Sequence, residues 1–327
     1  MPLRLADKTI TSPVFLAPLA GITDLPFRDL VSRFGAGLVV SEMVASQEMV
    51  QAKPGVREKA ELGFDKVNTA VQLAGREASW MALAAKMVED NGAKIIDINM
   101  GCPAKKVVNG YSGSALLKDL DHALTLIEAV VEAVDLPVTL KTRLGWDDNL
   151  LNAPELAKRA EAAGIQMITI HGRTRSQFYK GSADWAAINR VKEAVSIPVI
   201  ANGDICSATD ARQALDLSGA DGVMIGRGSQ GRPWLLAQVA ADLYGSEAPE
   251  VPEGEALADM IVAHYEAMLA FYGLDLGLRV ARKHLGWYMD EAGTHTALRR
   301  AVLTEKDPAK VIKLLPQAIL YPEEAAA

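Results

Sequence analysis

Residues 93–103 read Ala-Lys-Ile-Ile-Asp-Ile-Asn-Met-Gly-Cys-Pro, and this stretch decides how the chain folds. Its first six residues are mostly apolar and rich in β-branched side chains, which predicts a buried strand. Gly101 and Pro103 then favour a turn, because glycine accepts any backbone angle and proline fixes its own φ. The stretch therefore predicts a thiol, that of Cys102, on a stiff corner at the carboxyl end of a strand. A lone cysteine is also often a small buried hydrophobe, so both interpretations stay open on these residues.

Seven other stretches share this buried character, and a helical period follows most of them. They cover residues 14–18, 38–42, 69–75, 137–143, 167–173, 198–204 and 221–228. Eight apolar strands that alternate with helices indicate parallel βα units covered on both faces. Because eight such units in roughly 230 residues match the (β/α)8 TIM barrel, we predict that α/β fold. A doubly wound open sheet is the alternative, but it usually has fewer strands and a glycine-rich turn after the first one.

The chain changes character after residue 245. Residues 245–254 are rich in proline, glycine and acidic side chains, which predicts a linker. Helical patterns then cover residues 255–272, 277–291, 294–303 and 308–319. We therefore predict a catalytic barrel over residues 1–245 and a small C-terminal all-α helical domain over residues 246–327.

The helical segment also reverses the charge of the chain. The whole chain has a net charge of −7, which argues against a protein that coats nucleic acid nonspecifically. Residues 276–315, however, hold eight Lys or Arg side chains against four Asp or Glu side chains. This local excess of positive charge suggests a surface that faces RNA, and ordinary solvated helix faces are the alternative.

Cysteine and histidine usage limits the other functions. Two cysteines in 327 residues do not make a disulfide framework, and no signal or membrane-spanning pattern is found. We therefore predict a cytoplasmic protein with no membrane association and no obligate protein partner. We also predict no metal site, because His264, His284 and His295 lie at unrelated places in the helical segment.

Polar side chains gather at the predicted strand ends, where the active site of such a barrel lies. A backbone turn needs none of them, so together they suggest a large polar ligand; the alternative is that they bind loop backbones and one another. The residues concerned are Gln72, Asn99, Lys141, Arg143, His171, Arg173, Asn202, Asp204 and Arg227.

Two of these strand ends indicate a more specific kind of site. Glycines at 203, 226 and 228 let backbone N–H groups approach a ligand, and helices are expected to begin near Ser207 and Gln230, which predicts an anion site. Lys141 lies on an otherwise apolar strand and needs a partner. Cofactor oxygens would provide one, and an ion pair with Asp97 or Glu42 is the alternative.

The motifs in their order along the chain resemble those of the bacterial tRNA-dihydrouridine synthases. Cys102-Pro-Ala-Lys-Lys106 and Gln230-Gly-Arg-Pro-Trp234 are most similar to the B type of that family, and Leu19 stands where methionine is usual. The stretches that carry the resemblance are residues 18–24, 72–73, 97–106, 141–143, 171–175, 202–204, 226–227 and 279–284.

This resemblance implies an enzyme that uses FMN and NADPH, or NADH, to reduce the C5–C6 bond of a D-loop uridine in tRNA. It implies that Cys102 is the general acid, a role that suits a thiol because thiols are mostly protonated at neutral pH. The cofactor-binding residues that it implies are Pro18, Leu19, Ala20, Gln72, Lys141, His171, Asn202, Gly203, Asp204, Gly226 and Arg227.

For the substrate we expect Asn99, Arg143 and Tyr179 to bind the uracil. The residues expected to hold the rest of the tRNA are Lys105, Lys106, Arg173, Arg175, Arg279, Arg282 and Lys283. Two other functions stay open. One is an FMN-dependent reductase of a free pyrimidine, and the other is a non-catalytic RNA-binding barrel.

Overall fold

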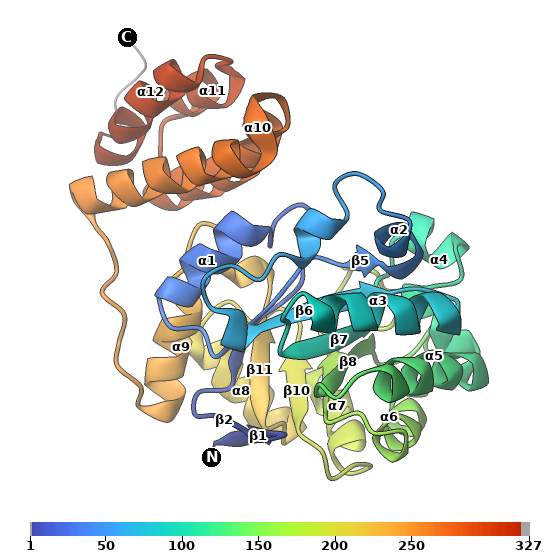
Figure 1. The fold of residues 1–327 in the computed structure, drawn as a ribbon. Coiled ribbons are helices and arrows are strands. Elements are labelled where there is room, and N and C mark those ends of the chain that lie inside the picture. Colours follow the sequence, from blue (N-terminus) through green and yellow to red (C-terminus); the bar gives the residue numbers. More distant parts are fainter. Residues whose placement is uncertain (1, 322–327) are drawn as a thin grey trace.

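Eight parallel strands close on themselves in the computed structural model, which describes residues 2–321 (Figure 1). Pairing of the last strand with the first, and of β4 with β6, completes the ring. The predicted barrel is therefore confirmed. In spatial order the strands are β3 (Val14–Leu16), β4 (Leu38–Val40), β6 (Thr69–Ala74), β7 (Ile95–Met100), β8 (Val138–Arg143), β9 (Met167–His171), β10 (Val199–Asn202) and β11 (Gly222–Ile225).

Helices surround this ring, and Asp or Ser side chains cap several of their first turns. They are α1 (Leu25–Arg33), α2 (Ser46–Val50), α3 (Ala78–Asp90), α4 (Lys105–Asn109), α5 (Leu120–Ala133), α6 (Ala153–Ala162), α7 (Trp185–Lys192), α8 (Ala208–Ser218) and α9 (Leu235–Tyr244). Strand β5 (Val44–Ala45) extends the sheet beside β6, and 3-10 turns cover Arg57–Ala60, Lys66–Asn68, Gly113–Lys118 and Arg227–Ser229.

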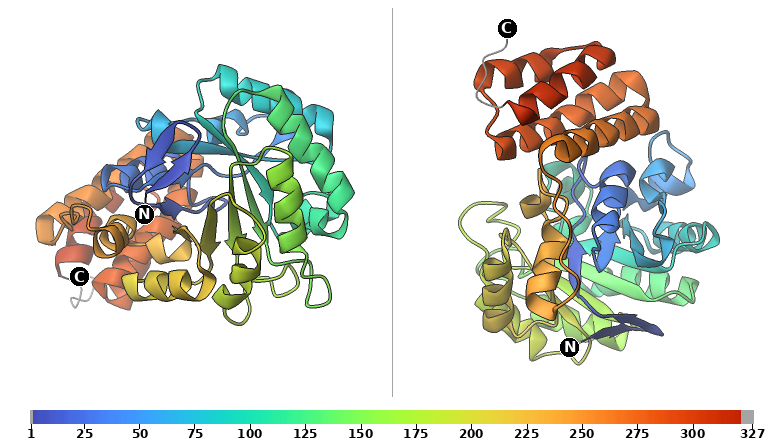
Figure 2. Two further views of the ribbon diagram at one scale, coloured as in Figure 1. Left: turned by 90° about the horizontal axis from the view of Figure 1, so that it is seen from below. Right: turned by 90° about the vertical axis from the view of Figure 1, so that its left-hand side faces the viewer.

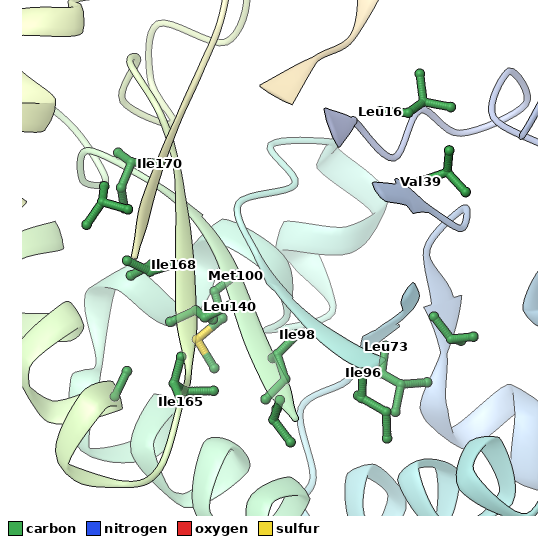
Figure 3. Close-up of a cluster of buried hydrophobic side chains, with 14 of the residues drawn as sticks. Leu16, Val39, Leu73, Ile96, Ile98, Met100, Leu140, Ile165, Ile168 and Ile170 are labelled. Carbon is green, nitrogen blue, oxygen red and sulfur yellow. The ribbon is translucent and has the colours of Figure 1, made fainter. Parts of the chain in front are cut away.

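Side chains alternate along each strand between two buried clusters. The set that includes Ile98, Leu140 and Ile168 packs against the surrounding helices (Figure 3). The other set, which includes Phe15 and Ile95, forms a separate cluster inside the barrel. This period of two also determines which polar residues face inward at the upper strand ends.

An N-terminal hairpin that the sequence did not predict closes the lower end of the barrel. Strands β1 (Leu3–Leu5) and β2 (Lys8–Ile10) pair in antiparallel fashion. Leu3, Leu5 and Ile10 join the interior cluster, and the view from below shows the hairpin across this end (Figure 2). Strands of three residues carry too little periodicity to be recognised in a sequence.

The C-terminal helices pack over the opposite end and have a core of their own (Figure 2). They are α10 (Gly254–Ala292), α11 (Thr296–Thr304) and α12 (Pro308–Leu320), and an extended segment joins them to α9. Residues 322–327 of the predicted helical domain lie outside the described residues. No helix among residues 2–321 is long and apolar enough to cross a membrane.

Helix α10 reverses direction at Gly273, whose φ of 71° and ψ of 170° are not helical. The two halves lie together, since a Cβ on Gly277 would be 3.0 Å from the Cα of Leu269. The reversal brings His264 and His284 into contact, with ring centroids 4.9 Å apart. The prediction that these histidines lie at unrelated places is therefore wrong, because their separation in sequence hides a helical hairpin.

Leu140 tests the outer core, because its side chain is fully buried between β8 and the helices. We expect Leu140→Ala to lower the free energy of unfolding by about 2–5 kcal/mol, through lost burial and the cavity left behind. Urea unfolding followed by circular dichroism measures this change. Leu217→Ala on α8 is the control, since that side chain is 47% exposed and a change within about 0.5 kcal/mol is expected. Equal losses in both variants would contradict this packing.

Candidate active site

A cavity of about 770 Å³ opens at the carboxyl ends of the strands, on the side of the C-terminal helices. It brings together side chains from every part of the barrel that the sequence singles out for the cofactor. The predicted residues that line it are Pro18, Leu19, Ala20, Gln72, Asn99, Cys102, Lys141, Arg143, His171, Tyr179, Asn202, Gly203, Asp204, Gly226 and Arg227.

The cavity also has a wall that the sequence did not reveal. Trp287, Asp290 and Glu291 of α10 line it from above. The carboxylate of Glu291 forms an ion pair with Arg232 of the barrel at 3.6 Å. A Cβ on Gly231 would lie 2.8 Å from the backbone oxygen of Trp287, so the two parts of the chain approach closely there. No local motif predicts this wall, because it depends on where α10 packs.

A chain of hydrogen bonds leads from the barrel interior to the cysteine loop. The buried carboxylate of Asp97 accepts from Thr139 Oγ1 at 2.6 Å and from Gln72 Nε2 at 2.7 Å. Gln72 Oε1 accepts from Asn99 Nδ2 at 2.7 Å. Asn99 Oδ1 accepts in turn from the backbone N–H of Cys102 at 3.0 Å. Asn99 therefore positions the cysteine loop, and one amide hydrogen of Asn99 stays available to a ligand.

The loop around Cys102 is held from its other side as well. Its carbonyl accepts from Ser114 N at 3.1 Å and from Ser114 Oγ at 2.8 Å. Gly113 has a φ of 60°, and a Cβ there would lie 2.8 Å from the Cys102 carbonyl oxygen, so glycine is required. The half-buried thiol therefore sits on a rigid backbone at the cavity wall.

Lys141 is the cation in the middle of the cavity. Its Nζ donates to Asn202 Oδ1 at 2.9 Å. Burial, and then the charge of Arg143, lower the pKa of Lys141 to about 8. Among the described residues Lys141 forms no ion pair with Asp97 or Glu42. The alternative that one of these carboxylates is its partner is therefore wrong. An anionic ligand beside it would restore its preference for the charged form.

The predicted anion site surrounds Asp204. Arg173 Nη1 donates to its Oδ1 at 3.0 Å, and Arg227 Nη2 donates to the same oxygen at 2.9 Å. Burial would raise the pKa of Asp204, but bonds from Arg173 and Ala183 N–H and the charge of Arg227 lower it. A Cβ on Gly203 would lie 2.8 Å from the Ala183 Cβ, so glycine is required at this corner.

Two expectations about this region are wrong. Arg173 is 1% exposed and its guanidinium is used by Asp204 and by loop carbonyls, so it is not part of an RNA-facing surface. The helix expected near Gln230 begins at Leu235 instead, because a 3-10 turn, Arg227–Ser229, comes first.

Arg143 holds loops as well as lining the cavity. Its Nε donates to the Gly101 carbonyl at 2.9 Å, and its Nη1 donates to the carbonyls of Thr174 and Phe178 at 2.9 and 2.8 Å. Its guanidinium also lies 5.5 Å from the ring centre of Tyr179. Most of its donors are therefore used by the protein, which leaves less capacity to bind a base than the sequence predicts.

The remaining predicted basic contacts lie outside the cavity lining. Lys105 and Lys106 are exposed on α4, directly after the cysteine loop. Arg175 stacks on Trp146, with its guanidinium carbon 4.6 Å from the ring centre. Lys283 of α10 reaches the Gly21 carbonyl at 3.5 Å. The last two predicted RNA contacts are also on α10, where Arg279 is exposed and Arg282 is partly buried.

Comparison with known proteins gives the family. The family model described as dihydrouridine synthase matches residues 15–322. The chain belongs to the dihydrouridine synthase family. It is 61% identical, over 99% of its own length and all of the relative's, to a "Probable tRNA-dihydrouridine synthase" of Rhodobacter capsulatus. It is also 48% identical to the "tRNA-dihydrouridine synthase B" of Pseudomonas putida, over 88% of this chain and 85% of the relative.

Among solved structures, the chain is similar to morphinone reductase. The TM-score is 0.54 with 15% sequence identity, over 76% of this chain and 90% of the reductase. At that identity the likeness supports the barrel fold alone. The expectation of an enzyme of this family is confirmed by the family match and the curated relatives.

Asp204 gives a pH-dependent prediction. Because its folded pKa is lowered, it contributes stability above its unfolded pKa, and this is lost as the pH falls through the folded value, below about pH 4. We expect Asp204→Asn to cost about 3 kcal/mol at pH 7, since it leaves the buried Arg173 without its partner. Denaturant unfolding should show the difference from wild type shrinking toward pH 3.

The matched control is Asp121→Asn. Asp121 also pairs with an arginine, Arg159, at 2.6 Å, but its side chain is 90% exposed. We expect this variant to lose less than about 1 kcal/mol at any pH. A loss in Asp204→Asn that does not depend on pH would contradict the electrostatic role of Asp204.

Proposed function

We propose that this protein reduces the C5–C6 bond of a uridine in tRNA to dihydrouridine, with FMN as cofactor and NADPH as reductant. The family and the printed names of its relatives support this reaction and substrate. The observation that carries the proposal is that one cavity is lined by a rigidly held thiol, a buried lysine and a glycine-rich corner with Arg227. NADH stays an alternative reductant.

The residues of the cavity fit FMN. Its volume lies within the range of sites for cofactors. Pro18, Leu19, Ala20 and the side chains of Gln72, Lys141 and His171 would hold the ring system and the ribityl chain, and a reduced flavin supplies a hydride. The phosphate end would be held by Asn202, Gly203, Asp204, Gly226 and Arg227.

The charges of the cavity side chains support this placement of the flavin ring and phosphate. The Lys141 ammonium is buried and would stabilise negative charge on a ring edge. Burial, then the charges of Lys141 and Arg143, lower the pKa of His171 well below its usual range, so it acts as a neutral hydrogen-bonding group. At the corner, the Asp204 carboxylate is paired with two arginines, and the Arg227 guanidinium is half exposed and available to a phosphate.

Cys102 is the proposed general acid. When a hydride adds to C6 of the uracil, negative charge develops on C5 and O4, and a proton must reach C5 from the opposite face. The Cys102 thiol donates that proton and is then reprotonated by solvent, so the uridine gains two hydrogens in all. The Cys102 N–H donates to Asn99 and the Cys102 carbonyl accepts from Ser114, so the backbone that carries the thiol is held in place for this transfer.

The tRNA would be held outside the cavity, since the uridine must leave its base stack to react. Lys105 and Lys106 on one rim and the basic face of residues 276–315 on the other are the proposed contacts. We propose on this basis that the C-terminal helices serve as the tRNA-binding part of the chain. Trp287 of α10 lines the cavity and gives an aromatic surface on the side of the C-terminal helices.

The deciding experiment is mass spectrometry of nucleosides from unmodified tRNA incubated with the protein, FMN and NADPH. A gain of two hydrogens on a D-loop uridine supports the proposal. Free uracil is tested in parallel. Reduction of free uracil without any change to tRNA would support the alternative function, an FMN-dependent reductase of a free pyrimidine. Purified protein that binds no flavin would instead support a non-catalytic barrel.

The thiol gives the first variant. We expect Cys102→Ala to keep bound flavin and its reduction by NADPH, and to lower the rate of dihydrouridine formation by about 100-fold or more, because the proton donor is missing. Flavin absorbance and single-turnover assays measure the two steps separately. Cys206→Ala removes the other free cysteine, an exposed residue that also lines the cavity but has no part in the proposed proton transfer, and should keep its activity. Equal activity in the two variants would remove the thiol from the mechanism.

Lys105 and Lys106 give the second variant. Both are exposed, and we expect Lys105→Glu with Lys106→Glu to weaken tRNA binding without a change in the flavin spectrum. Loss of two phosphate contacts should reduce the slope of log affinity against log salt by about 1.5. Lys158→Glu with Arg190→Glu, on exposed faces of α6 and α7, is the charge-matched control. If the control weakens binding equally, tRNA is attracted by overall charge alone.

A further inference from the structure

A second group of buried polar side chains lies outside the cavity lining, where the barrel meets the C-terminal helices. Asp24 caps the first turn of α1, and His264 and His284 come from the two halves of α10. Their ligand-capable atoms all lie within 4.8 Å of one another. Each residue is at most 4% exposed. Three residues from three separate segments therefore converge on one point that solvent does not reach.

Atoms at the centre of this cluster lack partners. Asp24 Oδ2, His264 Nε2 and both ring nitrogens of His284 have no hydrogen-bond partner among residues 2–321. The Tyr272 phenol lies beside the Asp24 carboxylate and the Ile22 carbonyl beside the His284 ring, close enough to shift the pKa values of both groups but outside good hydrogen-bond geometry, and His264 Nε2 has no such neighbour among the described residues. A buried polar atom without a partner is destabilising, so a cluster of them needs a ligand or a strong compensating contact.

The outer atoms of the cluster, by contrast, are held in place. His264 Nδ1 lies 3.0 Å from the Tyr288 hydroxyl, and Asp24 Oδ1 accepts from Phe27 N at 3.0 Å. The Phe27 ring packs on both imidazoles, with centroids 5.8 Å from His264 and 4.9 Å from His284. Metal-binding histidines and carboxylates are held in this way, with one atom oriented by the protein and the other turned to the ion.

We propose that Asp24, His264 and His284 bind one divalent ion of the zinc class. Two imidazole nitrogens and a carboxylate oxygen are a common ligand set for Zn²⁺, which takes water as a fourth ligand. Tetrahedral zinc needs donor atoms about 3.3 Å apart, so the set closes with side-chain shifts on the order of 1 Å.

The Arg28 guanidinium, which lies beside Asp24, donates to backbone carbonyls. Arg28 influences Asp24 electrostatically, but its Nη1 donates to the Thr23 carbonyl at 3.1 Å and its Nη2 to the Glu61 carbonyl. An ion in the cluster would pin α1 to both halves of α10. This structural role is separate from the proposed reaction, because none of the three ligands lines the cavity.

The test is the metal content of untagged holoenzyme from zinc-supplemented cultures, purified without chelators or metal-affinity resin. Inductively coupled plasma mass spectrometry should find about one zinc per chain after desalting. Exchange with Co²⁺ during expression should give visible absorption bands typical of tetrahedral nitrogen and oxygen ligands. Wild-type protein with less than about a tenth of an equivalent of any transition metal would overturn the proposal, and a buried water would then be the natural occupant.

Variants assign the ion to these residues. We expect His284→Gln and Asp24→Asn to lower bound zinc at least tenfold, and Asp24→Asn serves if the histidine variant does not fold. The controls are His295→Gln, an exposed histidine of the same segment, and Cys206→Ala, which removes an exposed thiol. Both controls should keep the ion. Zinc that is lost with Cys206→Ala and kept in both ligand variants would overturn the assignment.

Discussion

The Asp97 carboxylate lies inside the upper half of the barrel and accepts hydrogen bonds from Gln72 and Thr139. Because a carboxylate only accepts, the Gln72 amide must turn its oxygen toward Asn99, and Asn99 must turn its own oxygen toward the Cys102 loop. One buried charge thus orients a series of amides across two neighbouring strands. Burial raises the pKa of Asp97, and the bonds from Gln72 and Thr139 oppose that rise.

Apolar layers of the barrel surround these polar side chains and make their burial possible. Below it, the barrel interior is filled by apolar side chains such as Phe15 and Ile95, and the N-terminal hairpin closes that end. Outside it, Leu140 and Ile168 pack the strands against the helices. The apolar layers exclude water and supply the hydrophobic stabilisation, so the upper layer can hold Lys141 and Arg143 at positions that would otherwise be unfavourable.

Much of the site could be read from the sequence because a parallel barrel brings the carboxyl ends of its strands to one face. Gln72, Lys141 and Asn202 are far apart along the chain, yet each lies in the carboxyl half of a strand and each lines the same cavity. The errors have a common cause. Arg173 follows the end of β9 by two residues, but its side chain turns into the protein to pair with Asp204, and a pattern of strands does not show the direction of a long side chain.

The sequence by itself determined the barrel, the order of its strands and the cysteine corner, because the period-two alternation and the Gly and Pro residues act over a few neighbouring positions. Only the tertiary structure decided that Trp287 forms a cavity wall and that His264 meets His284 beside Asp24. Those contacts depend on the reversal of α10 at Gly273 and on its packing against α1. Packing between distant segments follows the shape of whole surfaces, and local spacing carries no record of it.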